Sequence, residues 1–251
     1  KNSMNDPQAL YEAINTETSE VLVGYDDVMR KITIAILING HILLEGVPGV
    51  AKTTAARLFA RVNNLQYQRV QMTPDVLPAD VTGTHVYREA TGEFDLRRGP
   101  IFTNVLLADE INRATPKTQS ALLESMREQT VTIEGETLEI PRPFLVIATQ
   151  NPIEYEGTYS LPQAQRDRFL FKIIMDIPER TVERQVLDRF THRHNFGPQD
   201  IEPTIDTETI ESARETVREV HVEDRVYEYL LNIIEATRSH QATEFGASPR
   251  A

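Results

Sequence analysis

Short apolar segments alternate with helical patterns along the first two thirds of the chain. Strands are predicted at residues 41–45, 67–71, 104–109, 144–149 and 169–175, and helices at residues 28–38, 52–62 and 116–129. This alternation is typical of a mostly parallel sheet with helices on its faces, so the sequence predicts an α/β fold. The first helix is predicted to end at Asn39-Gly40, because glycine accepts the left-handed conformation that often follows a helix.

Two pairs of alternating segments interrupt this pattern and predict β-hairpins. Residues 84–88 and 93–97 flank a Thr91-Gly92 turn, and residues 130–134 and 137–140 flank Gly135. Alternation on both sides of a glycine turn is a strong hairpin signal. Hairpins inserted into an α/β scaffold serve either recognition or surface decoration, and the pattern favours neither.

Beyond Pro178 the predicted elements are helical. They cover residues 178–191, 209–220 and 226–236. The second of these helices carries Ile210, Ala213, Val217 and Val220 on one face, which predicts that all four pack against the rest of the protein. Tyr227 and Tyr229 of the third helix are also expected to pack. We therefore place a domain boundary near Pro178, with a small helical domain after it.

Composition narrows the classes of protein. The 251 residues carry 26 basic and 38 acidic side chains, for a net charge of −12, which disfavours a protein that chiefly binds the nucleic-acid backbone. Cysteine is absent, which excludes disulfides and thiolate sites. The apolar stretch at residues 32–44 is too short and interrupted for a membrane span, and residues 1–6 lack the apolar core of a signal peptide. We expect a cytoplasmic protein.

A phosphate-binding loop is predicted between a strand and a helix. The segment reads Gly46-Val47-Pro48-Gly49-Val50-Ala51-Lys52-Thr53, followed by Thr54. In such loops backbone N–H groups surround the phosphates, a lysine reaches the β- and γ-phosphates, and a hydroxyl holds Mg²⁺. Lys52 and Thr53 stand in those positions, which predicts a site for ATP or ADP with Mg²⁺. Ala51 replaces the glycine of the general pattern, and a methyl group there is tolerated where φ is negative.

Polar residues follow two of the later strands. Asp109 and Glu110 end the strand at residues 104–109, and nucleotides bind at the carboxyl ends of strands in open α/β sheets. Asp109 is predicted to orient Mg²⁺ through water, and Glu110 to polarise the water that attacks the γ-phosphate, which favours hydrolysis. Asn151 follows the next strand and is predicted to help hold that water.

Several segments, in order along the chain, together resemble the MoxR family of AAA+ ATPases. They are residues 46–53, 73–83, 106–114, 148–152, 161–169 and 246–251. The resemblance implies a P-loop AAA+ nucleotide-binding domain over residues 1–178, with a parallel sheet, flanking helices and hairpin inserts. It also implies an all-α lid domain over residues 179–251, of which the C-terminal part is missing.

The resemblance further implies roles for single residues. Asn151 corresponds to the sensor-1 residue, and Arg250 to the sensor-2 arginine that reaches the γ-phosphate from the lid. Arg168 corresponds to the arginine finger that completes a neighbouring subunit's site, while Arg166 stands where the family usually has an apolar residue.

Val23 and Gly24 resemble the segment that lines the adenine pocket, where Tyr25 replaces the usual glutamine. Alanine at position 51 is usual in the family. The two hairpins resemble the helix-2 and pre-sensor-1 inserts of this AAA+ branch, which line the pore of the ring.

We therefore expect an ATPase that binds and hydrolyses MgATP in a homo-oligomeric, hexameric ring. The family implies chaperone-like remodelling of client protein complexes, often with a partner that bears a von Willebrand factor A domain. Two alternatives stay open. A nucleic-acid-dependent AAA+ motor is disfavoured by the net charge and by an aromatic content of 7%. A nucleotide-switched binding module with negligible turnover is disfavoured by Glu110 and Arg168.

Overall fold

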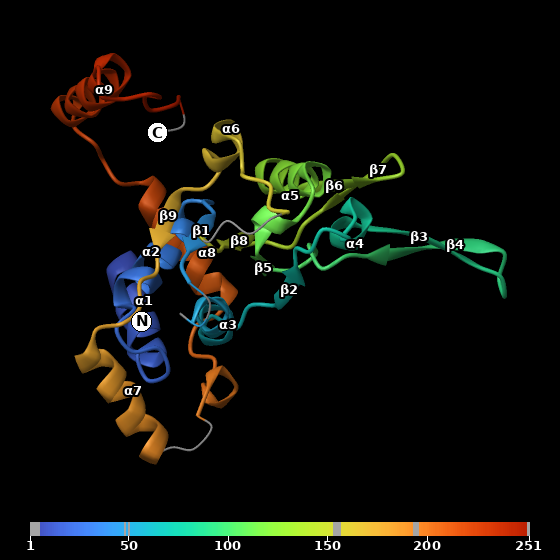
Figure 1. The fold of residues 1–251 in the computed structure, drawn as a ribbon, viewed down its shortest axis with the longest axis horizontal. Helices are drawn as coiled ribbons and strands as arrows, with labels where there is room; N and C mark the ends of the chain where they lie inside the picture. The colour runs from blue at the N-terminus through green and yellow to red at the C-terminus, as the bar shows by residue number, and fades with distance from the viewer. Residues whose placement is uncertain (1–5, 48, 50, 153–156, 193–195, 250–251) are drawn as a thin grey trace.

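The computed structural model describes residues 6–47, 49, 51–152, 157–192 and 196–249 (Figure 1). Five parallel strands form one sheet in the order β2-β5-β8-β1-β9. The strands are β1 (Ile42–Glu45), β2 (Tyr67–Gln71), β5 (Val105–Asp109), β8 (Leu145–Gln150) and β9 (Phe171–Ile174). The predicted parallel α/β fold is confirmed, with small shifts at the strand ends.

The helices include every one predicted from the sequence and one further long helix at the N-terminal end. They are α1 (Pro7–Thr18), α2 (Asp26–Leu37), α3 (Lys52–Val62), α4 (Pro78–Thr82), α5 (Pro116–Glu128), α6 (Gln163–Arg166), α7 (Arg180–His192), α8 (Thr207–Arg218) and α9 (Asp224–Ser239). The unpredicted α1 begins where the Asp6 carboxylate accepts the N–H of Gln8 at 3.2 Å. Among the described helices, none combines the length and apolar content that a bilayer crossing needs.

A hydrophobic core lies on each face of the sheet. Ile42 and Leu44 pack in the core formed with α1, α2 and α3, whereas Leu43 between them packs in the core that includes α5. Successive side chains of a strand point to opposite faces, so strands buried on both faces are apolar at nearly every position. This explains why the central strands stand out in the sequence.

The end of α2 differs from the prediction in one detail. Asn39, not Gly40, adopts the left-handed conformation, with φ of +56°. Asparagine tolerates this region better than most residues. Gly40 instead leaves room for Leu170, because a Cβ atom at position 40 would lie 2.9 Å from the Cβ of Leu170.

Both predicted hairpins are confirmed, as β3 (Gly83–Arg88) with β4 (Glu93–Arg98), and β6 (Thr130–Ile133) with β7 (Glu136–Glu139). The β3–β4 hairpin reaches far from the sheet in Figure 1. Gly83 at its base has φ of +103°, and a Cβ atom there would clash with the carbonyl oxygen of Arg97. The two strands therefore come together at a point where only glycine fits.

The helices after Pro178 differ in how they pack. Ile210 and Ala213 of α8 are buried in the core with α1, α2 and α3, as predicted, and Val217 packs against it. Val220 is 64% exposed because α8 ends before it. Tyr227 and Tyr229 are exposed, and no residue of α9, all of which is described, is buried. The predicted packing of these three side chains is therefore wrong. The division into domains at residue 178 stays a prediction.

Candidate nucleotide-binding site

The predicted phosphate loop joins β1, a strand inside the sheet, to the start of α3. Gly46 is buried, Val47 is half-buried, and Gly49 is exposed with φ of +92°. Pro48 and Val50 lie outside the described residues. The loop thus lies at the carboxyl end of β1, with the N-terminus of α3 behind it, which is the arrangement that favours phosphate groups.

Lys52 begins α3 and turns back over the loop. Its Nζ donates a hydrogen bond to the carbonyl oxygen of Gly46 at 2.6 Å. Burial lowers the pKa of Lys52, while the negative charges of Asp109, Glu110 and Glu45 act in the opposite direction. The lysine therefore lies within the electrostatic reach of the acids that end β5.

The backbone at Ala51 differs from the conformation in which a methyl group was expected to be tolerated. Its φ is +54°, in the left-handed region. An L-residue in this conformation costs roughly 1–2 kcal/mol, because its Cβ approaches the following carbonyl. The half-buried methyl group packs against the core, which offsets part of this cost. Thr53 and Thr54 follow in the first turn of α3, where Thr53 is exposed and Thr54 is half-buried.

Asp109 ends β5, and both of its carboxylate oxygens accept hydrogen bonds. Oδ1 accepts the hydroxyl proton of Thr149 at 2.5 Å, and the same hydroxyl oxygen accepts the N–H of Glu110 at 2.9 Å. Oδ2 accepts hydrogen bonds from Nη2 of Arg69 at 2.5 Å and from its Nε at 3.2 Å. Thr149 on β8 and Arg69 on β2 thus hold the carboxylate from the two strands next to β5.

Glu110 follows in a left-handed conformation, with φ of +56°. Its Oε2 accepts a hydrogen bond from Nε2 of Gln71 at 2.9 Å and forms an ion pair with Nη1 of Arg113 at 3.1 Å. Backbone strain outside helices and strands often occurs at functional sites. The strained backbone and the two partners fix the direction of the Glu110 side chain.

The residues around Asp109 suit a magnesium ion that arrives with nucleotide. Mg²⁺ typically takes one or two protein oxygen ligands and completes its shell with water and phosphate oxygens. The hydroxyl of Thr53 is a ligand of that kind, and the carboxylate of Asp109 is suited to hold one of the metal's water molecules. Within the described residues, no group of three or more histidine or acidic side chains is placed to bind a metal by itself.

Val23 and Gly24 lie between α1 and α2. Gly24 has φ of +81°, and a Cβ atom there would lie 2.7 Å from Cγ1 of Val182 in α7. The hydroxyl of Tyr25 donates to the carbonyl oxygen of Asp176 at 3.4 Å, and burial raises the pKa of this phenol. The segment predicted to line an adenine pocket is therefore packed beneath the start of α7.

The predicted sensor-1 residue Asn151 and finger residue Arg168 belong to different segments of the fold. Asn151 directly follows β8 and is half-buried, one residue after the sheet position paired with Glu45. Arg168 is half-buried against α5, where its Nη1 donates to the carbonyl oxygen of Leu123 at 2.6 Å. Its Nε is buried and makes no hydrogen bond with the described residues. Arg166 is exposed.

Arg168 also lines a hollow of about 240 Å³. The lining residues are Ser120, Leu123, Glu124, Arg127, Gln165 and Arg168. They include no residue of the phosphate loop and neither Asp109 nor Glu110. Arg250 lies outside the described residues, but nearby Ser248 donates from Oγ to Oδ1 of Asp167 at 2.9 Å.

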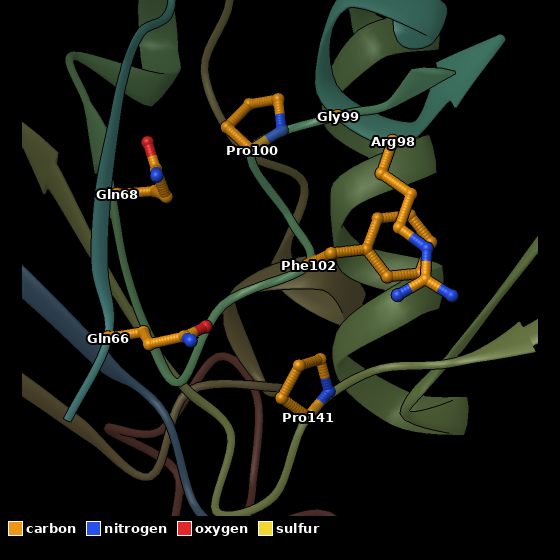
Figure 2. A pocket seen from close by; sticks show the side chains of 7 residues that line it. All are labelled: Gln66, Gln68, Arg98, Gly99, Pro100, Phe102 and Pro141. Atoms are coloured by element: carbon orange, nitrogen blue, oxygen red, sulfur yellow. The ribbon is translucent and has the colours of Figure 1, made fainter. Parts of the chain in front are cut away.

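A larger hollow, of about 580 Å³, opens beside β2 near the base of the β3–β4 hairpin (Figure 2). Figure 2 shows Gln66 and Gln68 on one side and the guanidinium of Arg98 over the ring of Phe102 on the other. The distance from Cζ of Arg98 to the ring centroid is 5.1 Å. None of the residues that line this hollow was predicted to bind nucleotide.

Four residues that contact Asp109 or Glu110, called the acid pair below, were not predicted from the sequence. They are Arg69, Gln71, Arg113 and Thr149. Arg69 and Gln71 share one face of β2 because they are two residues apart. That alternation was a usable signal, but only the strand order β2-β5 shows that they lie beside Asp109 and Glu110.

Comparisons with known proteins found a matching family and similar relatives. Residues 41–171 match the family described as ATPase family associated with various cellular activities (AAA). The chain is 47% identical over 232 residues to YeaC of Bacillus subtilis, which covers 92% of this chain and 72% of that protein. It is 44% identical over 244 residues to Chaperone MoxR1 of Mycobacterium tuberculosis, which covers 94% of this chain and 64% of that protein.

A solved structure of a candidate ATPase from Cytophaga hutchinsonii superposes with a TM-score of 0.86 at 38% sequence identity. The match covers 97% of this chain and 77% of the solved one. The chain thus spans about two thirds to three quarters of the length of these proteins.

Proposed function

The chain belongs to the MoxR family of AAA+ ATPases, and from this premise we propose that it binds MgATP and hydrolyses it to ADP and phosphate. The amides of the phosphate loop and Lys52 bind the phosphates, and Thr53 and Asp109 hold Mg²⁺. The metal, when bound, neutralises charge on the phosphate oxygens. Glu110 acts as the general base and Asn151 positions the attacking water.

One observation supports this proposal above the others. Asp109 and Glu110 end β5, and the loop with Lys52 follows β1, with β8 lying between these two strands. The carboxyl ends of parallel strands meet at one edge of a sheet. Thr149 of β8 holds both acids in place through its hydroxyl group. The residues proposed to bind phosphate and those proposed to activate water therefore follow strands that end at the same edge of the sheet.

Two variants separate binding from turnover. Lys52→Ala removes a cation from the phosphates, so we expect nucleotide affinity to fall by about tenfold or more, as charged hydrogen bonds contribute about 1.5–3 kcal/mol. Glu110→Gln keeps the shape but not the base, so ATP should bind while turnover falls by about 10²–10⁴. Fluorescence titration and phosphate release measure the two quantities. Equal loss of binding in both variants would contradict the assignment.

We further propose that the active form is a ring, with six subunits by family analogy. Arg168 then acts in the site of a neighbouring subunit, and Arg250 acts within its own. The position of Arg168 against α5, in a hollow without loop residues, is compatible with a role in trans. An arginine supplied in trans to a GTPase increases the rate by about 10³–10⁵.

The ring proposal predicts that turnover depends on assembly. The ATPase rate per subunit of the full-length protein should rise with protein concentration, and Arg168→Ala should remove most of the rate while nucleotide still binds. Arg166→Ala, two residues away and exposed, is the matched control. A rate per subunit that does not change with concentration, together with an active Arg168→Ala variant, would disprove the ring mechanism.

We propose that hydrolysis serves the remodelling of a client protein complex in the cytoplasm, with a von Willebrand factor A domain protein as the partner class. The relative named Chaperone MoxR1 supports a chaperone role. The Glu110→Gln variant, loaded with ATP, should retain a client long enough for capture. Stimulation of the wild-type ATPase by nucleic acid would instead favour a nucleic-acid motor.

A further inference from the structure

An ion pair between Arg69 and Asp109 joins β2 to β5 beside the candidate site. The parallel register places Arg69 opposite Leu107, two residues before Asp109, so the pair is diagonal across the two strands. A long arginine side chain spans such a diagonal. Both Nη2 and Nε of Arg69 point to the same oxygen, Oδ2.

The two oxygens of Asp109 have partners of different kinds. Oδ1 is held by the hydroxyl of Thr149, a fully buried residue whose hydroxyl is itself fixed by the N–H of Glu110. Oδ2 is held by Arg69, whose side chain is 47% exposed. The first contact is anchored in the core, whereas the second can exchange with solvent. Oδ2 is therefore the oxygen through which Asp109 can accept a new partner.

We propose that Arg69 sets the Mg²⁺ dependence of nucleotide binding by competing with the metal for Asp109. This inference rests on the proposed MgATP function. Arg69 occupies the exchangeable oxygen, and its positive charge repels a divalent cation at the same carboxylate. Arg69 fills both acceptor positions of Oδ2, so its side chain has to leave before this oxygen can serve the metal. Arg69 is thus a positioning residue that acts through Asp109.

Gln71 links this exchange to the second acid. Its Oε1 accepts a hydrogen bond from Nη2 of Arg69 at 2.7 Å, and its Nε2 donates to Oε2 of Glu110 at 2.9 Å. Because Nη2 of Arg69 donates both to Gln71 and to Asp109, a movement of Arg69 away from Asp109 also affects its contact with Gln71, which contacts Glu110 on the other side. The two residues of β2 therefore connect the metal-binding acid with the proposed base.

The test is the free Mg²⁺ concentration that gives half-maximal binding of a fluorescent ATP analogue to the full-length protein. Arg69→Gln removes the competing charge, so this midpoint should fall by about tenfold. Arg69→Met, which keeps an unbranched side chain without charge, should lower it similarly. Arg69→Lys keeps the charge and should stay within about threefold of the wild type.

The matched control is Arg98→Gln, which removes the same charge from the wall of the Figure 2 hollow and should keep the wild-type midpoint. Thermal unfolding identifies which variants are folded. An unchanged or raised midpoint in a folded neutral variant would overturn the inference. So would a fall in metal-free affinity with an unchanged midpoint, because Arg69 would then be a phosphate ligand. A wild-type protein that binds no nucleotide at any Mg²⁺ concentration would instead refute the proposed function.

Discussion

The hydroxyl of Thr149 donates a hydrogen bond to Oδ1 of Asp109 at 2.5 Å, and through it two adjacent parallel strands are connected at their carboxyl ends. The same oxygen accepts the N–H of Glu110. Thr149 is fully buried, and its hydroxyl group can donate one hydrogen bond to Asp109 while it accepts another from the backbone of Glu110. The orientation of the acid pair therefore depends on a residue that does not bind nucleotide itself.

Thr149→Val should destabilise the protein and weaken metal-dependent nucleotide binding. The substitution keeps the shape but removes the hydroxyl, so the N–H of Glu110 loses its partner. An unsatisfied buried group costs about 1–3 kcal/mol, measurable as a lower free energy of unfolding in urea. Thr149→Ser retains the hydroxyl and should lose less. Equal stability of the valine variant and the wild type would show that water replaces this contact.

Substitutions at Ala51 should separate backbone strain from phosphate binding. Glycine accepts φ of +54° without strain, so Ala51→Gly should keep nucleotide affinity and stay within about 1 kcal/mol of wild-type stability. A β-branched residue is a rare outlier in this region, so Ala51→Val should cost about 2 kcal/mol or more and lower the affinity. Urea unfolding and nucleotide titration test both. A valine variant as stable as the wild type would contradict the assigned conformation.

His41 should make stability depend on pH. Its Nδ1 accepts the N–H of Val146 at 3.0 Å, and the neutral ring places Nε2–H toward the carbonyl oxygen of Met126 at 3.1 Å. Burial lowers the pKa of His41 from 6.5 to about 4. Between these values the unfolded chain binds a proton that the native state does not, so stability falls as pH falls through this window. The loss approaches about 3 kcal/mol near pH 4.

The pH effect is measured as the urea midpoint of unfolding at pH 7, 6 and 5. His41→Gln should flatten the profile relative to the wild type, because glutamine does not titrate. His221→Gln, a change at an exposed histidine, should leave the profile unchanged. A His41→Gln profile parallel to the wild type would show that other groups cause the pH dependence.

The exposed aromatic pair on the β3–β4 hairpin should contribute little to stability. Tyr87 and Phe94 lie opposite each other, with ring centroids 5.2 Å apart, and they are 53% and 68% exposed. Cross-strand pairs of this kind contribute roughly 0.2–1 kcal/mol. Phe94→Ser should therefore change the free energy of unfolding by less than about 1 kcal/mol while it lowers capture of a client by the ATP-bound Glu110→Gln protein. Undiminished capture would exclude a recognition role for this pair.

The sequence predicted the sheet well because its central strands are buried on both faces. Residues 104–109 and 144–149 are apolar at nearly every position, and the structure places β5 and β8 there. It did not predict α1, although the Asp6-Pro7 cap was a usable signal. Val220, Tyr227 and Tyr229 were expected to pack, because an apolar pattern indicates a face but not whether anything covers it.

At the candidate site the sequence identified Lys52, Asp109 and Glu110 from motifs within single segments. Arg69 and Arg113 could not be assigned in the same way. The contact of Arg69 depends on which strands are neighbours, and that of Arg113 depends on the left-handed backbone of Glu110. The spacing of Glu110 and Arg113 is local, but the contact of Arg69 is not, because it joins two strands that are far apart in the sequence.

The place of β2 at the end of the sheet has a mechanical consequence. β2 is followed along the chain by α4 and then by the β3–β4 hairpin, so the backbone path from the hairpin to this edge strand passes through α4, whose Val81 is buried in the core that includes α5. Arg69 and Gln71 lie on that path. A displacement of the hairpin therefore has to move α4 within this core before it alters the two side chains of β2 that contact Asp109 and Glu110.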